Sequence, residues 1–252
     1  AVRSPAAPDA CRSQPHRCMV VEPGWIATRQ RGGLRLRQAS RVRVAPTNES
    51  TAADPMRLEI IHNRLMAIAE QMGEALRRTA HSVNVRERMD FSCAIYTANG
   101  ELVANAPHIP VHLGSMGAAV QSLLQRHRSV LTPGSAWLLN NPYLGGTHLP
   151  DLTVVSPRFD TSGELVQLVA ARAHHADVGG ITPGSVPAES HRLDEEGIIF
   201  DGLCIVDESG FHEAVIRDHL GQGPHPARQP DLNLVDLRAQ IAACHQGLAG
   251  LD

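Results

Sequence analysis

The order in which helical and strand patterns follow one another constrains the fold of this chain most strongly. Apolar residues recur at steps of three and four over residues 58–76, 115–127 and 234–248, and this spacing predicts three amphipathic helices. Asp54 and Pro55 stand just before the first of them, as an N-cap and a first-turn proline. The chain therefore opens and closes its patterned part with a helix.

Short apolar runs bounded by turn residues fill the space between these helices and predict strands. Asn99-Gly100 separates the first two runs and is a strong hairpin signal, and residues 160–163 form a turn between two later runs. The predicted strands cover residues 91–96, 101–104, 137–140, 152–156, 165–172, 198–200, 203–206 and 211–216. Adjacent strands without intervening helices favour an α+β (mixed α/β) fold with a central mixed sheet and flanking helices, and not a doubly wound sheet.

Residues 1–53 differ in composition from the rest. They are rich in arginine, poor in acidic residues and without a sustained apolar period, so we expect a disordered or non-family extension that contributes nothing to folding or chemistry. Arg35, Arg37, Arg41 and Arg43 alternate with other residues, which is compatible with a short exposed strand. The predicted domain is 54–252.

Charge and composition exclude several classes of function. The net charge of −3 offers no general attraction for nucleic acid or anionic membranes, and no apolar run reaches the length of a membrane span. All 23 basic residues are arginine, which excludes a Walker-type phosphate loop and a lysine Schiff base. The five scattered cysteines form no CxxC pair, so we expect reduced thiols in a cytoplasmic protein.

Two short segments carry most of the chemistry-bearing side chains. Residues 147–151 (Thr-His-Leu-Pro-Asp) contain His148 and Asp151, and residues 174–180 (His-His-Ala-Asp-Val-Gly-Gly) contain two histidines and Asp177. Imidazole and carboxylate together suit borderline divalent metals such as zinc, manganese, iron or nickel. The alternative is a structural polar network around ordinary turns.

His174 and His175 follow a predicted buried strand and are adjacent. Neighbouring strand residues face opposite sides, so only one of the two is expected to share a site with His148. Asp177 is a candidate to orient a ligating histidine from outside the ligand set.

Three further candidates come from other segments. Asp90 stands at the entry to a predicted strand and completes a set of two histidines and two aspartates, although its charged segment, which includes Glu87, is also typical of a solvated connection. His112 precedes a predicted helix N-terminus and is either a substrate contact or a cap. We assign His112, His175, Asp177 and Glu87 as candidate catalytic residues.

Several of these segments, in order, resemble the hydantoinase B/5-oxoprolinase family. The similar segments are 54–65, 87–92 (Glu-Arg-Met-Asp-Phe-Ser), 108–115 (His-Ile-Pro-Val-His-Leu-Gly-Ser), 141–151, 174–180 and 233–243. The resemblance covers residues 54–252 and does not extend to 1–53.

The resemblance implies a division of labour in the hydrolysis of cyclic amides. A hydantoinase A-type subunit binds ATP and phosphorylates 5-oxoproline, a hydantoin or a lactam, and the B-type part holds a divalent metal as Lewis acid or water activator. The resemblance implies that the family's metal ligands fall on Asp90, His148, Asp151 and His174, with the choice between His174 and His175 left open. ATP would then be bound by the partner subunit, which agrees with the absence of a phosphate-binding loop from this sequence.

Two alternatives to the hydrolase remain open. The family also implies a related role in an acetone- or acetophenone-type carboxylase. The second alternative belongs to a different class of function: a catalytically inactive structural partner of an A-type subunit. Family members continue beyond the last helix, so we expect this chain to be an N-terminal portion and inactive alone.

Overall fold

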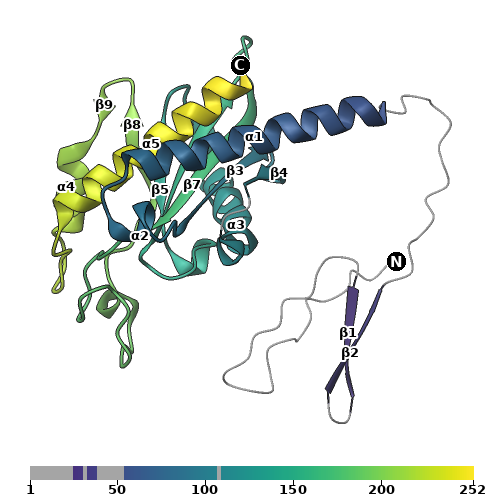
Figure 1. Ribbon diagram of the computed structural model, residues 1–252. Helices are drawn as coiled ribbons and strands as arrows, with labels where there is room; N and C mark the ends of the chain where they lie inside the picture. Colours follow the sequence, from purple (N-terminus) through teal and green to yellow (C-terminus); the bar gives the residue numbers. More distant parts are fainter. Residues whose placement is uncertain (1–24, 31–32, 39–53, 107–108) are drawn as a thin grey trace. The chain divides into compact units, whose positions relative to one another are not determined.

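The chain is described by a computed structural model that covers residues 25–30, 33–38, 54–106 and 109–252 (Figure 1). It divides into two units, Ala1–Ala52 and Ala53–Asp252. In the first unit, strands β1 (Trp25–Gln30) and β2 (Gly33–Gln38) form an antiparallel hairpin. Arg35 and Arg37 therefore lie on a strand, as predicted, and Arg35 is exposed, whereas Arg41 and Arg43 fall outside the described residues.

The second unit has the predicted α+β architecture. Its sheet has seven strands in the order β4-β3-β7-β6-β5-β8-β9, and every neighbouring pair is antiparallel, so the sheet is not mixed in strand direction. The strands are β3 (Phe91–Thr97), β4 (Leu102–Asn105), β5 (Ala136–Leu139), β6 (Asp151–Phe159), β7 (Leu165–His174), β8 (Asp201–Asp207) and β9 (Gly210–Phe211).

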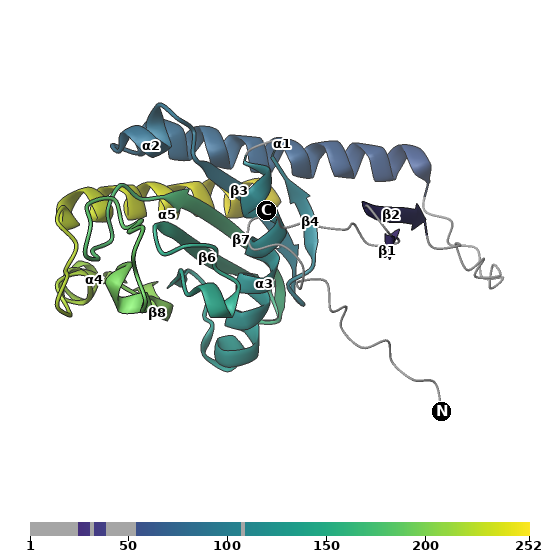
Figure 2. The same cartoon turned by 90° about the horizontal axis from the view of Figure 1, so that it is seen from below.

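Helices cover both faces of this sheet and make a three-layer unit (Figure 2). One core lies between the sheet and the paired helices α1 (Pro55–Thr79) and α5 (Pro230–Leu251). A second, smaller core lies between the opposite face and α3 (Pro110–His127). Alternate residues of each central strand point into the two cores, as the period of two requires: Ile95 belongs to the first and Tyr96 to the second.

Helix α1 begins as predicted but is only half packed. The side chain of Asp54 accepts a hydrogen bond from the Met56 backbone N–H, and Met72 and Leu76 are fully buried further along. Leu58 and Ile61, at the start of the same stripe, are 54% and 55% exposed. The first turns extend past the sheet and have no apolar partner among the described residues (Figure 1).

This difference along one helix predicts two unequal mutational effects. Met72→Ala is expected to lower the free energy of unfolding by about 2–5 kcal/mol, because it leaves a cavity in the core. Leu58→Ala is expected to change it by less than about 0.5 kcal/mol. Urea unfolding of both variants measures this, and equal losses would show that the first turns are packed.

One predicted boundary and two predicted strands are wrong. Helix α3 begins at Pro110 and not at Ser115, because proline fits the first turn of a helix. The strand predicted over 211–216 is β9 followed by helix α4 (Glu213–Leu220), in which Ile216 and Leu220 are four residues apart and both buried. Residues 198–200 are not a strand, although the Phe200 carbonyl accepts from Asn140 N–H.

Shorter elements complete the unit. A one-turn helix α2 (Val83–Arg86) precedes β3, and three short 3-10 helices are η1 (Arg128–Val130), η2 (Pro142–Leu144) and η3 (Leu193–Glu195). The hairpin at Asn99-Gly100 and the turn at 160–163 are confirmed. No helix in the described ranges combines the length and apolar character needed to span a membrane. Cys93 and Cys244 are buried in the core, Cys204 is partly buried, and Cys11 and Cys18 lie outside the described residues.

Candidate metal centre

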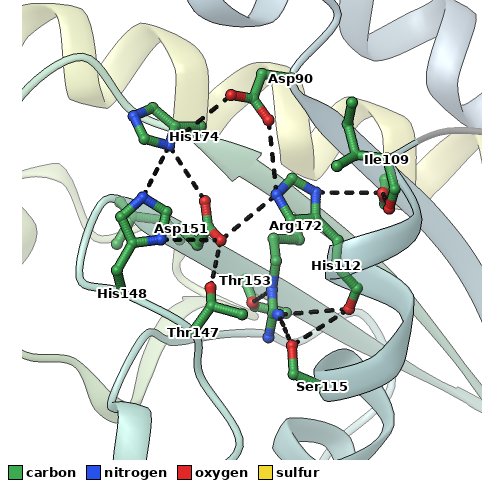
Figure 3. Close-up of polar contacts among 12 residues, drawn as sticks. Asp90, Ile109, His112, Ser115, Thr147, His148, Asp151, Thr153, Arg172 and His174 are labelled. Carbon is green, nitrogen blue, oxygen red and sulfur yellow. Dashed lines mark hydrogen bonds and ion pairs between the residues drawn. The ribbon is translucent and has the colours of Figure 1, made fainter. Parts of the chain in front are cut away.

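The edge of the sheet where β6 begins and β7 ends brings the predicted ligands together. Asp151 is the first residue of β6 and pairs in register with His174, the last residue of β7. Asp90 directly precedes β3, and its carbonyl accepts from the His174 backbone N–H at 3.0 Å. His148 lies in the loop before β6. Figure 3 shows the four side chains turned toward one another.

The distances among three of these side chains match the edges of a metal coordination polyhedron. His148 Nε2 lies 3.1 Å from His174 Nδ1, and His174 Nδ1 lies 3.4 Å from Asp151 Oδ1. His148 Nδ1 lies 3.3 Å from Asp151 Oδ2. Nitrogen and oxygen ligands at about 2.1 Å from one ion are roughly 3.0–3.4 Å from each other. Each contact is close to a ligand–ligand spacing, and with one ligand atom taken from each residue the three atoms lie within 4.8 Å of one another.

Asp90 and His112 close the site from the opposite side. Asp90 Oδ2 lies 3.9 Å from His174 Nδ1, and Asp90 Oδ1 lies 3.6 Å from His112 Nε2. His112 is buried in the first turn of α3, and not before the helix as predicted, and its Nε2 is 3.4 Å from Asp151 Oδ2. Ser92 Oγ donates to the Ile109 carbonyl and so accepts from His112 Nδ1–H at 3.2 Å. This contact turns the Nε2 of His112 toward both carboxylates.

Asp151 is the electrostatic centre of the cluster. Burial alone would raise its pKa, but the nearby imidazoles of His112, His148 and His174 and the Thr147 hydroxyl outweigh it and hold the pKa well below the usual range. The hydrogen bond with Asp151 in turn raises the pKa of His148. Asp151 Oδ1 is buried and has no hydrogen bond among the described residues. A buried anionic oxygen that faces imidazole nitrogens fits a cation, because buried polar atoms are otherwise almost always bonded.

Two glycines let the loop before His148 approach the rest of the site. Gly145 has φ of +90°, and a Cβ there would lie 2.2 Å from the Ala119 backbone nitrogen in α3. At Gly146 a Cβ would lie 2.3 Å from the Asn140 carbonyl oxygen. Only glycine fits either position, so this backbone contact fixes the loop that carries His148 against α3.

Arg172 is a component of the site that the sequence analysis missed. It is fully buried in β7, and its guanidinium donates to Thr153 Oγ1 at 2.8 Å, to Ser115 Oγ, and to the carbonyls of Gly145 and His112 at 3.2 and 3.5 Å. It therefore joins β6, α3 and the His148 loop beneath the ligands. The sequence did contain a signal for it, an arginine within the apolar run 165–173. Charged residues are rarely fully buried without a partner, so this arginine indicated polar partners in the core.

His175 does not share the site. It is fully buried on the α5 side, where Asn233 Nδ2 lies 3.0 Å from its Nδ1 and Gln240 Oε1 lies 3.0 Å from its Nε2. Gln240 donates to the carbonyls of Leu152 and Ala171, so its Oε1 accepts from Nε2–H of His175. Burial lowers the pKa of His175, which agrees with a neutral ring. The alternation along the strand thus separates the two histidines, and His174 is the one at the site.

Asp177 and Glu87 also lie outside the cluster. Asp177 orients no histidine; it accepts from Arg228 Nη1 at 2.8 Å and from the backbone N–H groups of Gly179 and Gly184, because its loop folds back on itself. Burial raises its pKa, but these bonds outweigh that effect and lower it. Glu87 is exposed at the end of α2, with Arg86 Nε at 3.6 Å.

Two variants test which of the adjacent histidines binds metal. His174→Ala is expected to remove metal binding with little effect on the metal-free fold. His175→Ala is expected to cost about 2–4 kcal/mol of unfolding free energy, because it leaves buried amides unpaired, and to leave metal stoichiometry unchanged. Metal analysis and urea unfolding measure both, and loss of metal only in His175→Ala would reverse the assignment.

The cluster opens into a pocket of roughly 530 Å³. Its walls are formed by Arg88, Asp90, Ile109, His112, Thr147, His148, Asp151 and His174. Arg88 is the only side chain among them that is positively charged regardless of histidine protonation, and it makes the pocket suitable for an anionic group.

Comparison with known proteins agrees with this architecture. The profile of the hydantoinase B/oxoprolinase family matches residues 54–252. The chain is 47% identical over 201 residues to 5-oxoprolinase of Saccharomyces cerevisiae and 43% identical over 222 residues to 5-oxoprolinase 1 of Arabidopsis thaliana. These matches cover 77% and 83% of this chain but only 16% and 18% of the relatives, so the chain spans less than a fifth of their length.

Two solved structures share the fold. An ATP-dependent caprolactamase from Pseudomonas jessenii superposes with a TM-score of 0.70 and 25% identity, over 79% of this chain and 34% of that one. A nucleotide-free acetone carboxylase has a TM-score of 0.72 at 21% identity, over 79% of this chain and 26% of the other, and this likeness concerns the fold alone. On the profile match and the identity to the 5-oxoprolinases, the chain belongs to the hydantoinase B/oxoprolinase family.

Proposed function

We propose that residues 54–252 form the metal-binding portion of an ATP-dependent cyclic-amide hydrolase that acts on 5-oxoproline, a hydantoin or a lactam. The observation that carries this proposal is the group of His148, Asp151 and His174, whose ligand atoms lie within 4.8 Å of one another, with Asp90 Oδ2 3.9 Å from His174 Nδ1 in the same pocket. The names of the relatives, 5-oxoprolinases and a caprolactamase, support the substrate class.

The four side chains, with His112 beside them, are the residues that would hold a divalent cation. Two or three imidazoles and two carboxylates are typical ligands of zinc, manganese, iron or nickel. A cation bound there would supply Lewis acidity toward the carbonyl or imidate carbon of the substrate. The buried Asp151 Oδ1 without a hydrogen bond supports this assignment.

The remaining pocket residues would bind substrate and move protons. His112 is held by Ser92 through Nδ1, so its Nε2 is free to accept or release a proton beside Asp90 and Asp151. Arg88 places a fixed positive charge at the pocket wall, where it would bind a carboxylate or a phosphorylated oxygen.

ATP would be bound by a hydantoinase A-type partner. The chain contains no lysine and no Gly-rich phosphate loop, so it lacks the usual means of binding a triphosphate. An unactivated amide is a poor electrophile, and phosphorylation of its oxygen by the partner would supply the activation that this portion does not.

Reconstitution tests the proposal. The purified 252-residue chain, with ATP and metal, is expected to leave 5-oxoproline, hydantoin and caprolactam unchanged, and hydrolysis is expected once the A-type partner and the remaining B-type sequence are added. In that complex His148→Ala should abolish turnover without affecting ATP binding by the partner. ATP-dependent turnover by the chain alone would contradict the division of labour, and full activity of His148→Ala would contradict the metal site.

A further inference from the structure

A second group of potential metal ligands lies on the β8–β9 edge of the sheet, apart from the site described above. Cys204 and Asp207 come from β8, and His212 stands between β9 and α4. Their thiol, carboxylate and imidazole ligand atoms all lie within 4.8 Å of one another. In the order of the sheet, β5 stands between β8 and β6, where the first site begins.

The hydrogen bonds of His212 leave one ring nitrogen in need of a cation. Its Nδ1 lies 3.3 Å from the Cys204 carbonyl oxygen, which can only accept, so Nδ1 carries the proton of the neutral ring. Its Nε2 lies 2.9 Å from Asp207 Oδ1. With the ring proton on Nδ1, Nε2 and Asp207 Oδ1 are two acceptors in contact, and a second ring proton or a metal ion between them would relieve their repulsion.

The neighbouring Ser209 does not donate a hydrogen to His212 Nε2. Ser209 Oγ lies 3.2 Å from His212 Nε2, but it is only 2.6 Å from Asp207 Oδ1 and donates its hydrogen there. The Ser209 backbone N–H donates to the same oxygen at 2.8 Å. Asp207 is thereby held with Oδ1 beside the imidazole, and its Oδ2 makes no hydrogen bond that restricts it among the described residues.

We propose that Cys204, Asp207 and His212 form a second metal site that binds zinc through thiolate, carboxylate and imidazole. Thiolate favours zinc over harder divalent metals, and three protein ligands leave the fourth position to water. The contact between His212 Nδ1 and the Cys204 carbonyl is the outer hydrogen bond that a zinc-bound histidine usually makes. Zinc displaces the thiol proton to solvent and replaces the proton between His212 and Asp207.

Such a site would connect the β8–β9 hairpin to the start of α4. Cys204 packs against the smaller core, whereas Asp207 and His212 are partly exposed, so the site is anchored on one side and accessible to ions on the other. The three ligand atoms lie within 4.8 Å of one another, and the side chains of Asp207 and His212 would draw closer to reach ligand distances of about 2.0–2.3 Å.

Cobalt(II), used as a spectroscopic probe for zinc, distinguishes this site from the first. In the full chain carrying Asp151→Asn, which disables the first site, cobalt is expected to give a near-ultraviolet thiolate charge-transfer band that excess zinc removes. Adding Cys204→Ser should abolish the band, and adding His212→Gln should weaken cobalt binding at least about 10-fold. Zinc should raise the Tm of Asp151→Asn and not that of Asp151→Asn with Cys204→Ser.

Two results would overturn the second site. A band that persists after Cys204→Ser would assign the thiolate to another cysteine. Absence of any band at millimolar cobalt would leave only a proton between His212 and Asp207. Neither result concerns the ligands of the first site, so the two proposals fail independently.

Discussion

Asp151→Asn is expected to lower the affinity of the first site for a divalent metal at least about 100-fold. This is more than the loss of a hydrogen-bond partner of a metal ligand usually costs. The substitution keeps the shape of the side chain but removes the negative charge that His112, His148 and His174 surround. It also replaces one carboxylate oxygen with an amide nitrogen, which is a donor and a poor metal ligand. In the reconstituted complex turnover should fall in parallel, because the same ligand set holds the metal.

Asp160→Asn is the matched control for this prediction. Asp160 lies in the turn at the opposite end of β6 and β7, where Oδ1 accepts from the backbone N–H groups of Ser162 and Glu164, and asparagine can accept in the same way. Isothermal titration with zinc or manganese should therefore give wild-type affinity for Asp160→Asn. Circular dichroism in the presence of a chelator checks that both variants fold. Unchanged metal affinity in folded Asp151→Asn would exclude Asp151 as a ligand.

Gly145→Ala is expected to destabilise the chain strongly, with a loss of about 3 kcal/mol or more in the free energy of unfolding. The positive φ alone costs roughly 1–2 kcal/mol for a residue with a Cβ. The new Cβ would also lie 2.2 Å from Ala119 N and 2.4 Å from Ala118 C, and helix backbone cannot yield cheaply. The loop would be forced away from α3, so His148 should leave the site and metal affinity should fall too.

Gly163→Ala separates the cost of the positive φ from the cost of the collision with α3. Gly163 has φ of +84° and nothing within 4 Å of a Cβ, so its alanine variant carries the conformational cost without the collision. A loss of about 1 kcal/mol with normal metal binding is expected, measured by urea unfolding and titration. Equal losses in the two variants would show that the loop does not rest on α3 as described.

Local signals predicted much of the fold. The cap at Asp54 and the hairpin at Asn99-Gly100 specify backbone geometry within a few residues, so α1 and the β3–β4 pair could be predicted. The strand predicted over 211–216 failed because Val215 and Ile216 have strand propensity. Burial of Ile216 and Leu220 against the core overrides that propensity, and such tertiary contacts are not visible in a short window.

The site could also be predicted only in part, because some of its contacts join segments that are distant in sequence. His148 and Asp151 are close in sequence, and strand alternation correctly separated His174 from His175. The approach of Asp90 depends on β3 pairing with β7, which local patterns do not determine. Its place at the entry to a strand made Asp90 a candidate, and the resemblance to a family placed it among the ligands. Arg172 was missed because its partners are mainly hydroxyls and carbonyls of segments distant in sequence.

The direct pairing of Asp151 with His174 across β6 and β7 makes the proposed metal site depend on strand register. A slip of one residue would bring Ala173 or His175 opposite Asp151 and turn the wrong histidine toward the pocket, since alternate residues face opposite sides. A chain in that misfolded state would lose its ligand set while keeping most of its backbone hydrogen bonds. Metal present during folding would therefore favour the correctly aligned sheet, because only that alignment gains the binding energy of the ion.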